Sequence, residues 1–297
     1  MNHEGAGRRR RVILAFATVY LAWGSTYLAI RLALETLPPL IMAGTRFLVA
    51  GALLYGVARL RGAAAPAWRS WAAAAAVGAL LLLGGNGSVC WAEQAVPSAI
   101  AALVAALTPL WMVLFAWRRD RPGPRVVAGL LAGMAGVAVL VVPGFQSGAL
   151  SATSLAVLVA GSLSFAAGSI YARRAPLPSD TILSTGMQML AGGALLMLAG
   201  GAAGEAARVD LAAVSMKSML AAGYLVVIGS LAGYTAYSWL LRVRPAAQVS
   251  TYAFVNPVVA VLLGWMVGGE PLHAATLAGA GVVVVSVAAV VGRRKEK

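Results

Sequence analysis

The chain has little of what soluble enzymes use for chemistry. Its 297 residues include one cysteine, two histidines and nine acidic residues. Cys90 is alone, which excludes an intramolecular disulfide. His3 and His273 lie at opposite ends of the chain and give no ligand pair for a metal ion. HExxH, Ser/His/Asp and P-loop patterns are also missing, so we expect no cofactor and no catalytic metal.

Long polar segments are missing too. The longest interval between apolar stretches, residues 202–216, is too short for a folded domain. Apolar residues make up 61% of the chain and charged residues 11%, far below the roughly 25% that is usual for soluble proteins. We therefore expect an integral membrane protein that contacts lipids and performs its function within its helices.

Ten stretches are long and apolar enough to cross a membrane, which takes about 20 residues. They are residues 12–33, 38–59, 71–91, 97–117, 124–143, 152–172, 181–201, 217–240, 246–267 and 271–292. No acidic residue lies near the middle of any of them, so a carboxylate relay across the membrane core has little support. We predict an all-α protein with ten transmembrane helices.

Positive charge is sorted along the chain. All but four of the 23 Lys and Arg residues lie at the chain ends or in alternate gaps between predicted spans; the exceptions are Arg31, Arg46, Arg208 and Lys217. Because basic residues of short loops stay cytoplasmic, both termini are predicted to be cytoplasmic. The net charge of +14 then serves as an anchor against an anionic inner leaflet, and we expect no nucleic-acid partner.

The two halves of the chain resemble each other. Three residue pairs around the fourth and ninth spans are 148 positions apart: Pro109 and Pro257, Leu114 and Leu262, Trp117 and Trp265. We predict two five-helix repeats, residues 1–145 and 146–297. Because five is odd, the second repeat would insert in the opposite sense, as in alternating-access transporters. Chance similarity between apolar segments is the alternative.

Arg46 is the most informative polar residue within a span. It lies about 12 Å into the second span at 1.5 Å per residue. An unpaired cation facing lipid at that depth costs at least about 2.5 kcal/mol. We expect Arg46 to face the protein interior, either in a structural pairing or as the partner of an anionic group on a solute.

Aromatic and polar side chains recur at helical spacing on the first and third spans. Trp23 and Tyr27 are one turn apart and would present aromatic surface at mid-depth; packing of Trp23 between helices is the alternative. Asn86 and Glu93 share one face of the third span. Glu93 is interpreted as a partner of Arg46 or a protonatable outer gate, or else as the cap of a short outer turn.

The two repeated prolines are predicted to interrupt their helices. Proline frees a carbonyl in the preceding turn, and such a group persists in a membrane only where protein or water satisfies it. Tyr252 and Asn256, with the carbonyl that Pro257 frees, form a candidate substrate surface. Pro109 with Trp111 is the counterpart in the first half. A simple packing kink is the alternative.

A third stripe lies on the eighth span. Ser230, Tyr234 and Tyr237 fall on one face, and Gln188 is a lone amide in the seventh span. They are candidates for the lining of the inner pathway. Tyr237 lies near the cytoplasmic end of its helix, where tyrosines usually belong to the interfacial belt, so we expect it there.

Several short motifs match one known family over nearly the whole chain. They are Trp23-Gly24-Ser25-Thr26-Tyr27, Pro38-Pro39, Arg46-Phe47, Gly85-Asn86-Gly87, Ala92-Glu93, Pro97-Ser98, Pro109-Leu110 and Val255-Asn256-Pro257. With them the chain resembles the EamA-type branch of the drug/metabolite transporter superfamily, and within it the bacterial inner-membrane exporters. The resemblance implies ten helices around a central cavity and efflux of small metabolites, usually amino acids and their derivatives.

We therefore predict a multi-pass inner-membrane carrier, not an enzyme, that exports small metabolites by alternating access. The predicted substrate contacts are Trp23, Tyr27, Arg46, Asn86, Trp111, Tyr252 and Asn256, and the predicted gating or coupling residues are Glu93, Pro109 and Pro257. Passive facilitation and proton antiport remain alternatives, as do a monomer and a weak homodimer. An intramembrane enzyme acting on lipid-linked substrates lacks a reactive set here, and a channel would need a continuous polar lining.

Overall fold

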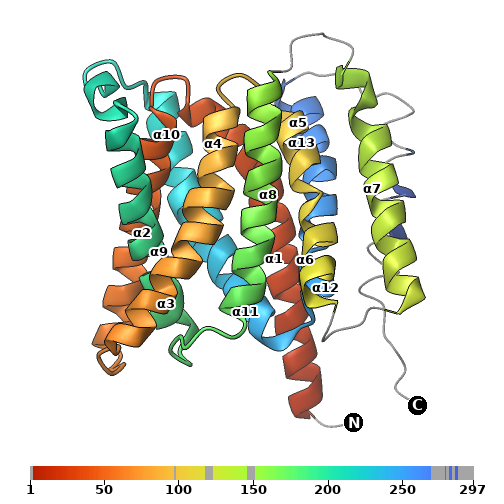
Figure 1. Ribbon diagram of the computed structural model, residues 1–297, viewed down its shortest axis with the longest axis horizontal. Coiled ribbons are helices and arrows are strands. Elements are labelled where there is room, and N and C mark those ends of the chain that lie inside the picture. Colours follow the sequence, from red (N-terminus) through yellow and green to blue (C-terminus); the bar gives the residue numbers. More distant parts are fainter. Residues whose placement is uncertain are drawn as a thin grey trace.

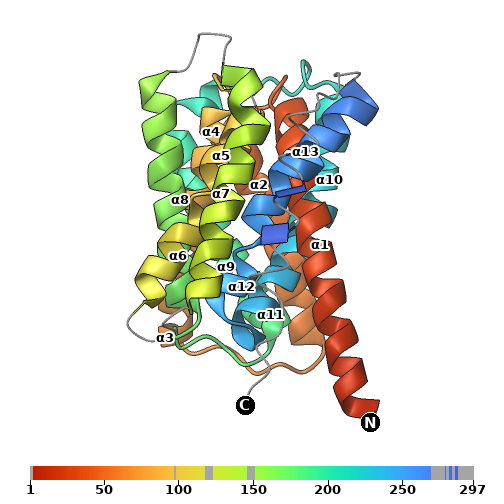
Figure 2. The ribbon, with the colours of Figure 1, turned by 90° about the vertical axis from the view of Figure 1, so that its right-hand side faces the viewer.

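The computed structural model describes residues 3–96, 98–117, 123–145 and 151–268, with isolated residues between 278 and 286. All regular structure in these ranges is helical, which confirms the all-α prediction. The long helices stand roughly side by side, and α1 begins at the lower end of the bundle in Figure 1. Helix α7 stands at the right-hand edge of Figure 1 and faces the viewer in Figure 2, and it packs against α5 and α13.

The helices of the first half follow the predicted spans closely. They are α1 His3–Ala33, α2 Pro39–Leu60, a continuous helix formed by α3 Trp68–Gly78, η1 Ala79–Gly87 and α4 Ser88–Ala92, then α5 Ser98–Ala105, α6 Thr108–Ala116 and α7 Pro124–Phe145. The middle segment of the third helix, η1, is a π-helix.

The second half repeats this pattern as far as the structure describes it. Its helices are α8 Ala152–Ala172, α9 Thr181–Ala202, the short 3₁₀ turn η2 Glu205–Arg208, a continuous helix formed by α10 Met216–Tyr224, η3 Leu225–Tyr234 and α11 Thr235–Val243, then α12 Ala246–Val249 and α13 Tyr252–Gly268. Here too the middle segment of the third long helix, η3, is a π-helix.

Six helices within the described residues are long and apolar enough to cross a membrane. They are Gly7–Ala33, Pro39–Leu60, Trp68–Ala92, Ala152–Ala172, Thr181–Ala202 and Met216–Val243. The predicted fifth span is described with its side chains only in part, and most of the predicted tenth lies outside the described residues. The chain is thus a multi-pass membrane protein, and the count of ten stays a prediction.

The predicted fourth and ninth spans are not continuous helices. The first is broken at Ala106 and Leu107, and the second at Ser250 and Thr251. Pro109 falls in the first turn of α6, where its missing N–H costs no hydrogen bond. Pro257 lies inside α13, six residues after the break. The expectation that both prolines mark the interruptions is therefore correct for Pro109 and wrong for Pro257.

Glycines bring α2 and α9 into close contact. A Cβ atom at Gly51 would lie 2.7 Å from the backbone nitrogen of Leu190, and one at Gly186 would lie 2.7 Å from that of Tyr55. Small residues allow this approach of two membrane helices. One wall of the bundle is thereby fixed backbone against backbone.

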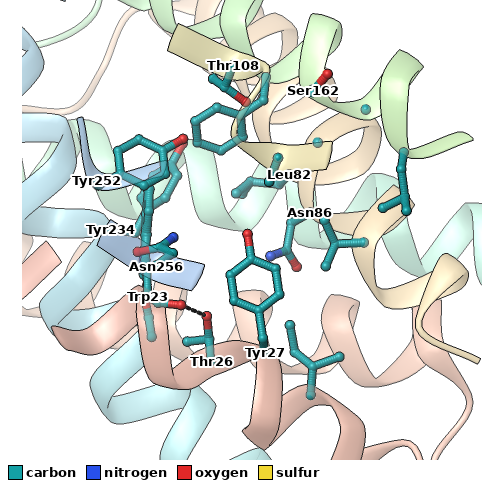
Figure 3. A pocket seen from close by; sticks show the side chains of 18 of the residues that line it. Trp23, Thr26, Tyr27, Leu82, Asn86, Thr108, Ser162, Tyr234, Tyr252 and Asn256 are labelled. Atoms are coloured by element: carbon teal, nitrogen blue, oxygen red, sulfur yellow. Dashed lines mark hydrogen bonds between the residues drawn. The ribbon is translucent and has the colours of Figure 1, made fainter. Parts of the chain in front are cut away.

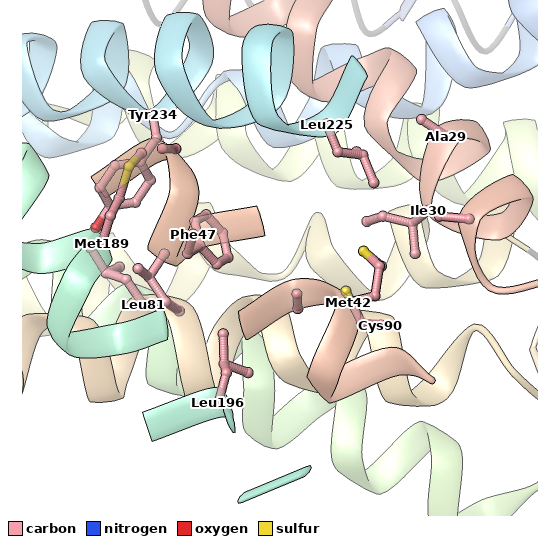
Figure 4. Close-up of a cluster of buried hydrophobic side chains, with 14 of the residues drawn as sticks. Ala29, Ile30, Met42, Phe47, Leu81, Cys90, Met189, Leu196, Leu225 and Tyr234 are labelled. Carbon is pink, nitrogen blue, oxygen red and sulfur yellow. The ribbon is translucent and has the colours of Figure 1, made fainter. Parts of the chain in front are cut away.

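A hydrophobic cluster joins α1, α2, η1, α9 and η3. Figure 4 shows members of this cluster, among them Ile30, Phe47, Leu81, Met189 and Leu225, each of which exposes no more than 2% of its surface. Ile30 and Phe47 also line the cavity described below. The cluster therefore holds in place the helices that form the cavity.

Candidate functional site: a central polar and aromatic cavity

A cavity of about 80 Å³ lies between the long helices. That is room for roughly half a dozen water molecules. Its lining includes six of the seven predicted substrate contacts: Trp23, Tyr27, Arg46, Asn86, Tyr252 and Asn256. In Figure 3 the aromatic side chains of Trp23, Tyr234 and Tyr252 gather on one side, with Tyr27 and Asn86 facing them.

Arg46 is held in this cavity by two neutral partners. Its Nε donates to Ser230 Oγ over 3.0 Å and its Nη2 to Asn86 Oδ1 over 3.4 Å, while Nη1 has no partner. The residue is 4% exposed, and its Cζ lies 4.2 Å from the ring centre of Phe47. Among the described residues no carboxylate pairs with it. The prediction that Arg46 faces the interior is confirmed, and its Nη1 has no partner within the described part of the protein.

Trp23 combines the two roles that the sequence left open. Its Nε1 donates to the carbonyl of Gly229 over 3.1 Å, and its ring lies 4.7 Å from Tyr237 and 4.9 Å from Tyr252, measured between centroids. Phe165 of α8 completes this aromatic wall at 5.9 Å from Trp23. Trp23 therefore packs between helices and lines the cavity at the same time.

Tyr237 does not belong to an interfacial belt. It is fully buried, and its hydroxyl shares a 2.6 Å hydrogen bond with Ser169 of α8. The position of Tyr237 near a helix end suggested the membrane interface. That expectation is wrong because α11, which continues directly from η3, packs against α1. Tyr234, one turn earlier, lines the cavity and donates to Gln188 Oε1 over 3.0 Å. Gln188 itself lies behind it.

The break before α13 places two predicted contacts at the start of that helix. Tyr252 is its first residue, and Asn256 is one turn further along. Asn256 is 1% exposed and its Oδ1 has no hydrogen-bond partner. Thr108, the first residue of α6 after the other break, also lines the cavity. Both breaks therefore lead directly to cavity residues.

Trp111 is the predicted contact that does not reach the cavity. Its Nε1 donates over 3.1 Å to Ser162 Oγ, and Ser162 is the residue that lines the wall. Trp111 therefore positions Ser162 from behind. Sequence reasoning also missed Thr26, Thr108 and Phe165. Two signals in the sequence could have pointed to cavity residues. Thr26 directly precedes Tyr27 on α1, and Ser162 and Phe165 are one turn apart on α8.

Glu93 follows the last residue of α4, one position beyond the span Trp68–Ala92. It is 7% exposed, and neither carboxylate oxygen has a hydrogen-bond partner, so the predicted pairing with Arg46 is absent. Burial raises the pKa of this carboxyl well above its ordinary value, against the opposing influence of the Arg31 charge. It does not line the cavity.

Membrane-crossing helices around a buried polar and aromatic cavity define a multi-pass membrane protein with an internal cavity. The model of the EamA-like transporter family matches residues 10–142 and again 152–292. The chain belongs to this family, whose members are transporters rather than enzymes.

Two relatives agree with this family assignment, and one solved structure has the same fold. The chain is 42% identical over 276 residues to the "Uncharacterized inner membrane transporter YedA" of Escherichia coli (strain K12), covering 92% of this chain and 88% of the relative. It is 26% identical over 286 residues to the "Uncharacterized transporter YvbV" of Bacillus subtilis (strain 168), covering 94% and 91%. A crystal structure at 24% identity shares the fold with a TM-score of 0.75, over 94% of this chain and 95% of the other.

Proposed function

We propose that the chain is a bacterial inner-membrane carrier that exports small metabolites, such as amino acids or related amphipathic compounds, through the central cavity. The observation that carries this proposal is Arg46, a buried guanidinium with a free Nη1 in an aromatic cavity. Ionisable residues within membrane helices are costly and mark solute pathways by default. Arg46 would hold an anionic group, the aromatic rings the apolar body, and Asn256 a hydrogen-bond donor of the solute.

Transport would proceed by alternating rearrangement of residues 1–145 and 146–297, inserted in opposite senses with both termini cytoplasmic. The two separate family matches support two repeats, and so do the π-segments and the broken helices found in each half. Inverted repeats with interrupted helices at a midplane site are the architecture of such carriers. Reporter tags at each end test the orientation; a periplasmic tail with a cytoplasmic head would contradict it.

Counterflow in proteoliposomes tests the carrier itself. Vesicles loaded with an unlabelled solute should accelerate uptake of the same labelled solute, whereas a channel or an enzyme shows no such trans-stimulation. A panel of amino acids and nucleosides would identify candidates.

Arg46→Ala should abolish this uptake and leave membrane insertion intact, because among the described residues that line the cavity Arg46 is the one cation. Arg61→Ala is the matched control, since Arg61 lies exposed just after α2. Full transport by the Arg46 variant would remove this residue from the site.

Passive facilitation and proton antiport remain alternatives for the driving force. Under antiport, an imposed pH gradient drives solute accumulation, and Glu93→Gln removes that response if the buried Glu93 carboxyl carries the proton. Under passive facilitation, the pH gradient changes solute accumulation by neither the wild type nor Glu93→Gln. Sizing of the purified protein decides between a monomer and a weak homodimer.

A further inference from the structure

We infer that the transported solute occupies the cavity as a monoanion with an apolar body and a neutral hydrogen-bond donor, without an ammonium group. This inference rests on the proposed function of the cavity and narrows it. Within the amphipathic compounds considered above, it selects carboxylates over zwitterionic amino acids.

The charge of the cavity wall carries the inference. Arg46 is the single charged side chain among the described residues that line the cavity, and no acidic residue lines it. A buried charge without a counter-charge is strongly unfavourable. A monoanion neutralises Arg46, so the occupied cavity carries no net charge. A zwitterion would instead add an ammonium group that finds no carboxylate.

Two buried carboxyl groups, Glu205 and Glu93, lie elsewhere in the protein, and neither is placed to pair with an ammonium group in the cavity. Glu205 Oε2 accepts from the backbone nitrogens of Leu40 and Ile41 over 2.9 and 3.0 Å, at the start of α2. Glu93 lies seven residues beyond Asn86, about 10 Å along the helix, and outside the lining. Aromatic faces and the Asn256 oxygen would attract an ammonium group, but more weakly than a carboxylate pairing would.

The free polar atoms define the rest of the solute. Ser230 and Asn86 hold Nε and Nη2 of Arg46, so Nη1 and its two N–H groups are left to donate charge-assisted hydrogen bonds. Asn256 Oδ1 is buried and unpartnered, so it needs a donor from the solute. The wall formed by Trp23 and Tyr252 lines the same cavity. The cavity thus fits an anionic end, an apolar body and a neutral O–H or N–H donor.

Four probes with one phenyl body separate these features. They are 3-(4-hydroxyphenyl)propionate, its analogue 3-phenylpropionate without the hydroxyl, the zwitterion tyrosine and the cation tyramine. Affinity is measured by calorimetry on the purified full-length protein in detergent, because free carboxylic acids cross lipid bilayers unaided. We expect the hydroxyphenyl acid to bind at least 10-fold more tightly than tyrosine, tyramine not to bind, and 3-phenylpropionate to be weaker than its hydroxylated analogue.

Asn86→Asp provides the converse test. It places a carboxylate next to Arg46 with almost no change in shape, so it should weaken the acid at least 10-fold and shift preference toward tyrosine or tyramine. Asn86→Ala is the control, since it removes the same hydrogen bond without adding charge and should keep the order of the probes. Size-exclusion profiles and tryptophan fluorescence confirm that both variants are folded.

Three outcomes would overturn the inference while leaving the proposed function standing. The first is tyrosine binding as tightly as the acid, and the second is an Asn86→Asp variant with an unchanged order of probes. The third is counterflow of a zwitterion or a cation when no probe binds. Absence of both probe binding and counterflow would refute the proposed function itself.

Discussion

The two π-helical segments, η1 and η3, occupy matching places in the predicted halves, and each is held by a side chain from elsewhere in the chain. Ser164 of α8 donates to the carbonyl of Leu80 in η1 over 2.8 Å, and Trp23 of α1 donates to that of Gly229 in η3 over 3.1 Å. The two carbonyls are 149 positions apart. A π turn disturbs the regular hydrogen-bond ladder, and in a membrane the displaced groups need a donor from protein.

Matching glycines make room for the two donors. Gly84 and Gly233 are also 149 positions apart. A Cβ atom at Gly233 would lie 2.7 Å from Trp23 Nε1, and one at Gly84 would overlap Ser164 Oγ. The same arrangement is therefore present twice: a π-helical segment whose carbonyl accepts from a side chain of another helix, with a glycine that makes room for that side chain.

The donors themselves differ, and so do the surfaces they create. Trp23 lines the cavity and packs against Tyr237 and Tyr252, whereas Ser164 is not part of the lining. The η1 side instead contributes the amide of Asn86 next to Arg46. Similarity of backbone thus goes with asymmetry of chemistry: each copy supplies one polar contact to Arg46, Asn86 or Ser230, but only the η3 copy has an aromatic donor that lines the cavity. A solute would meet two unlike faces.

The largest effect is expected from filling the two matched glycines. Gly84→Val and Gly233→Val should each destabilise the protein by about 2–3 kcal/mol, because the added methyl groups overpack the donor side chains. Thermal unfolding in detergent measures this loss. Gly56→Val is the control, since nothing lies within 4 Å of a Cβ atom at Gly56. Equal melting temperatures for all three variants would contradict the role of Gly84 and Gly233 in making room for the two donors.

A second comparison concerns the start of the second helix of each half. Buried Glu205 binds the backbone nitrogens of Leu40 and Ile41 in α2, whereas α9 is capped locally by Asp180, whose Oδ1 accepts from two nitrogens over 2.7 and 3.0 Å. Glu205→Ala should cost about 2 kcal/mol, because it leaves two partly buried backbone donors unpaired. Asp180→Ala should cost about 1 kcal/mol, as is usual for an exposed cap. Thermal unfolding would contradict the comparison if the two losses were equal.

The described helices were predictable because apolar length is a local property of the sequence. The second and sixth spans, predicted at residues 38–59 and 152–172, are observed at Pro39–Leu60 and Ala152–Ala172. The π-segments were not predictable from hydropathy. Their carbonyls depend on Ser164 and Trp23, which lie far away in the chain. Of the two helix breaks, the one beside Pro109 was predicted, whereas the one at Ser250 and Thr251 was misplaced because it lies six residues before Pro257.

The candidate site was predictable where burial of a polar group is expensive. Arg46 and Asn86 had to face inward, and the helical spacing then added Trp23 and Tyr27. Trp111 was misplaced because its indole donates to Ser162, which lies between it and the cavity, and the sequence gives no sign of that partner on α8. Apolar and small residues such as Phe165 carried no signal that distinguishes a cavity wall from ordinary packing.

Substitution of each donor to a π-segment, Ser164 and Trp23, distinguishes an effect on stability from an effect on solute binding. Ser164→Ala and Trp23→Phe each remove one hydrogen bond to a π-segment and should each cost about 1 kcal/mol or less. Only Trp23→Phe should weaken solute affinity, by several-fold, since Trp23 alone of the two lines the cavity. Calorimetry with 3-(4-hydroxyphenyl)propionate alongside thermal unfolding measures both quantities. An equal loss of affinity in Ser164→Ala would show that the asymmetry is unimportant for binding.

The smallest effect concerns the ends of the same two helices, at Glu93 and Arg242, again 149 positions apart. Arg242 donates to the carbonyls of Ser179 and Pro178 over 2.6 and 2.9 Å, whereas Glu93 is buried without a partner. Because burial raises the pKa of Glu93 above 4.5, the folded protein binds this proton more tightly than the unfolded chain does. Its contribution to stability is complete below the unfolded pKa and is lost as pH rises through the folded one.

The wild-type melting temperature should therefore fall by a few degrees between pH 5 and pH 8, and Glu93→Gln should flatten this slope because the neutral amide does not titrate. Arg242→Gln is the matched control. It loses two carbonyl contacts at every pH, so it should lower the melting temperature by the same amount at both ends of the range. Parallel slopes for the wild type and Glu93→Gln would mean that the Glu93 carboxyl does not titrate in this interval, and the contrast between the two helix ends would then be one of hydrogen bonding alone.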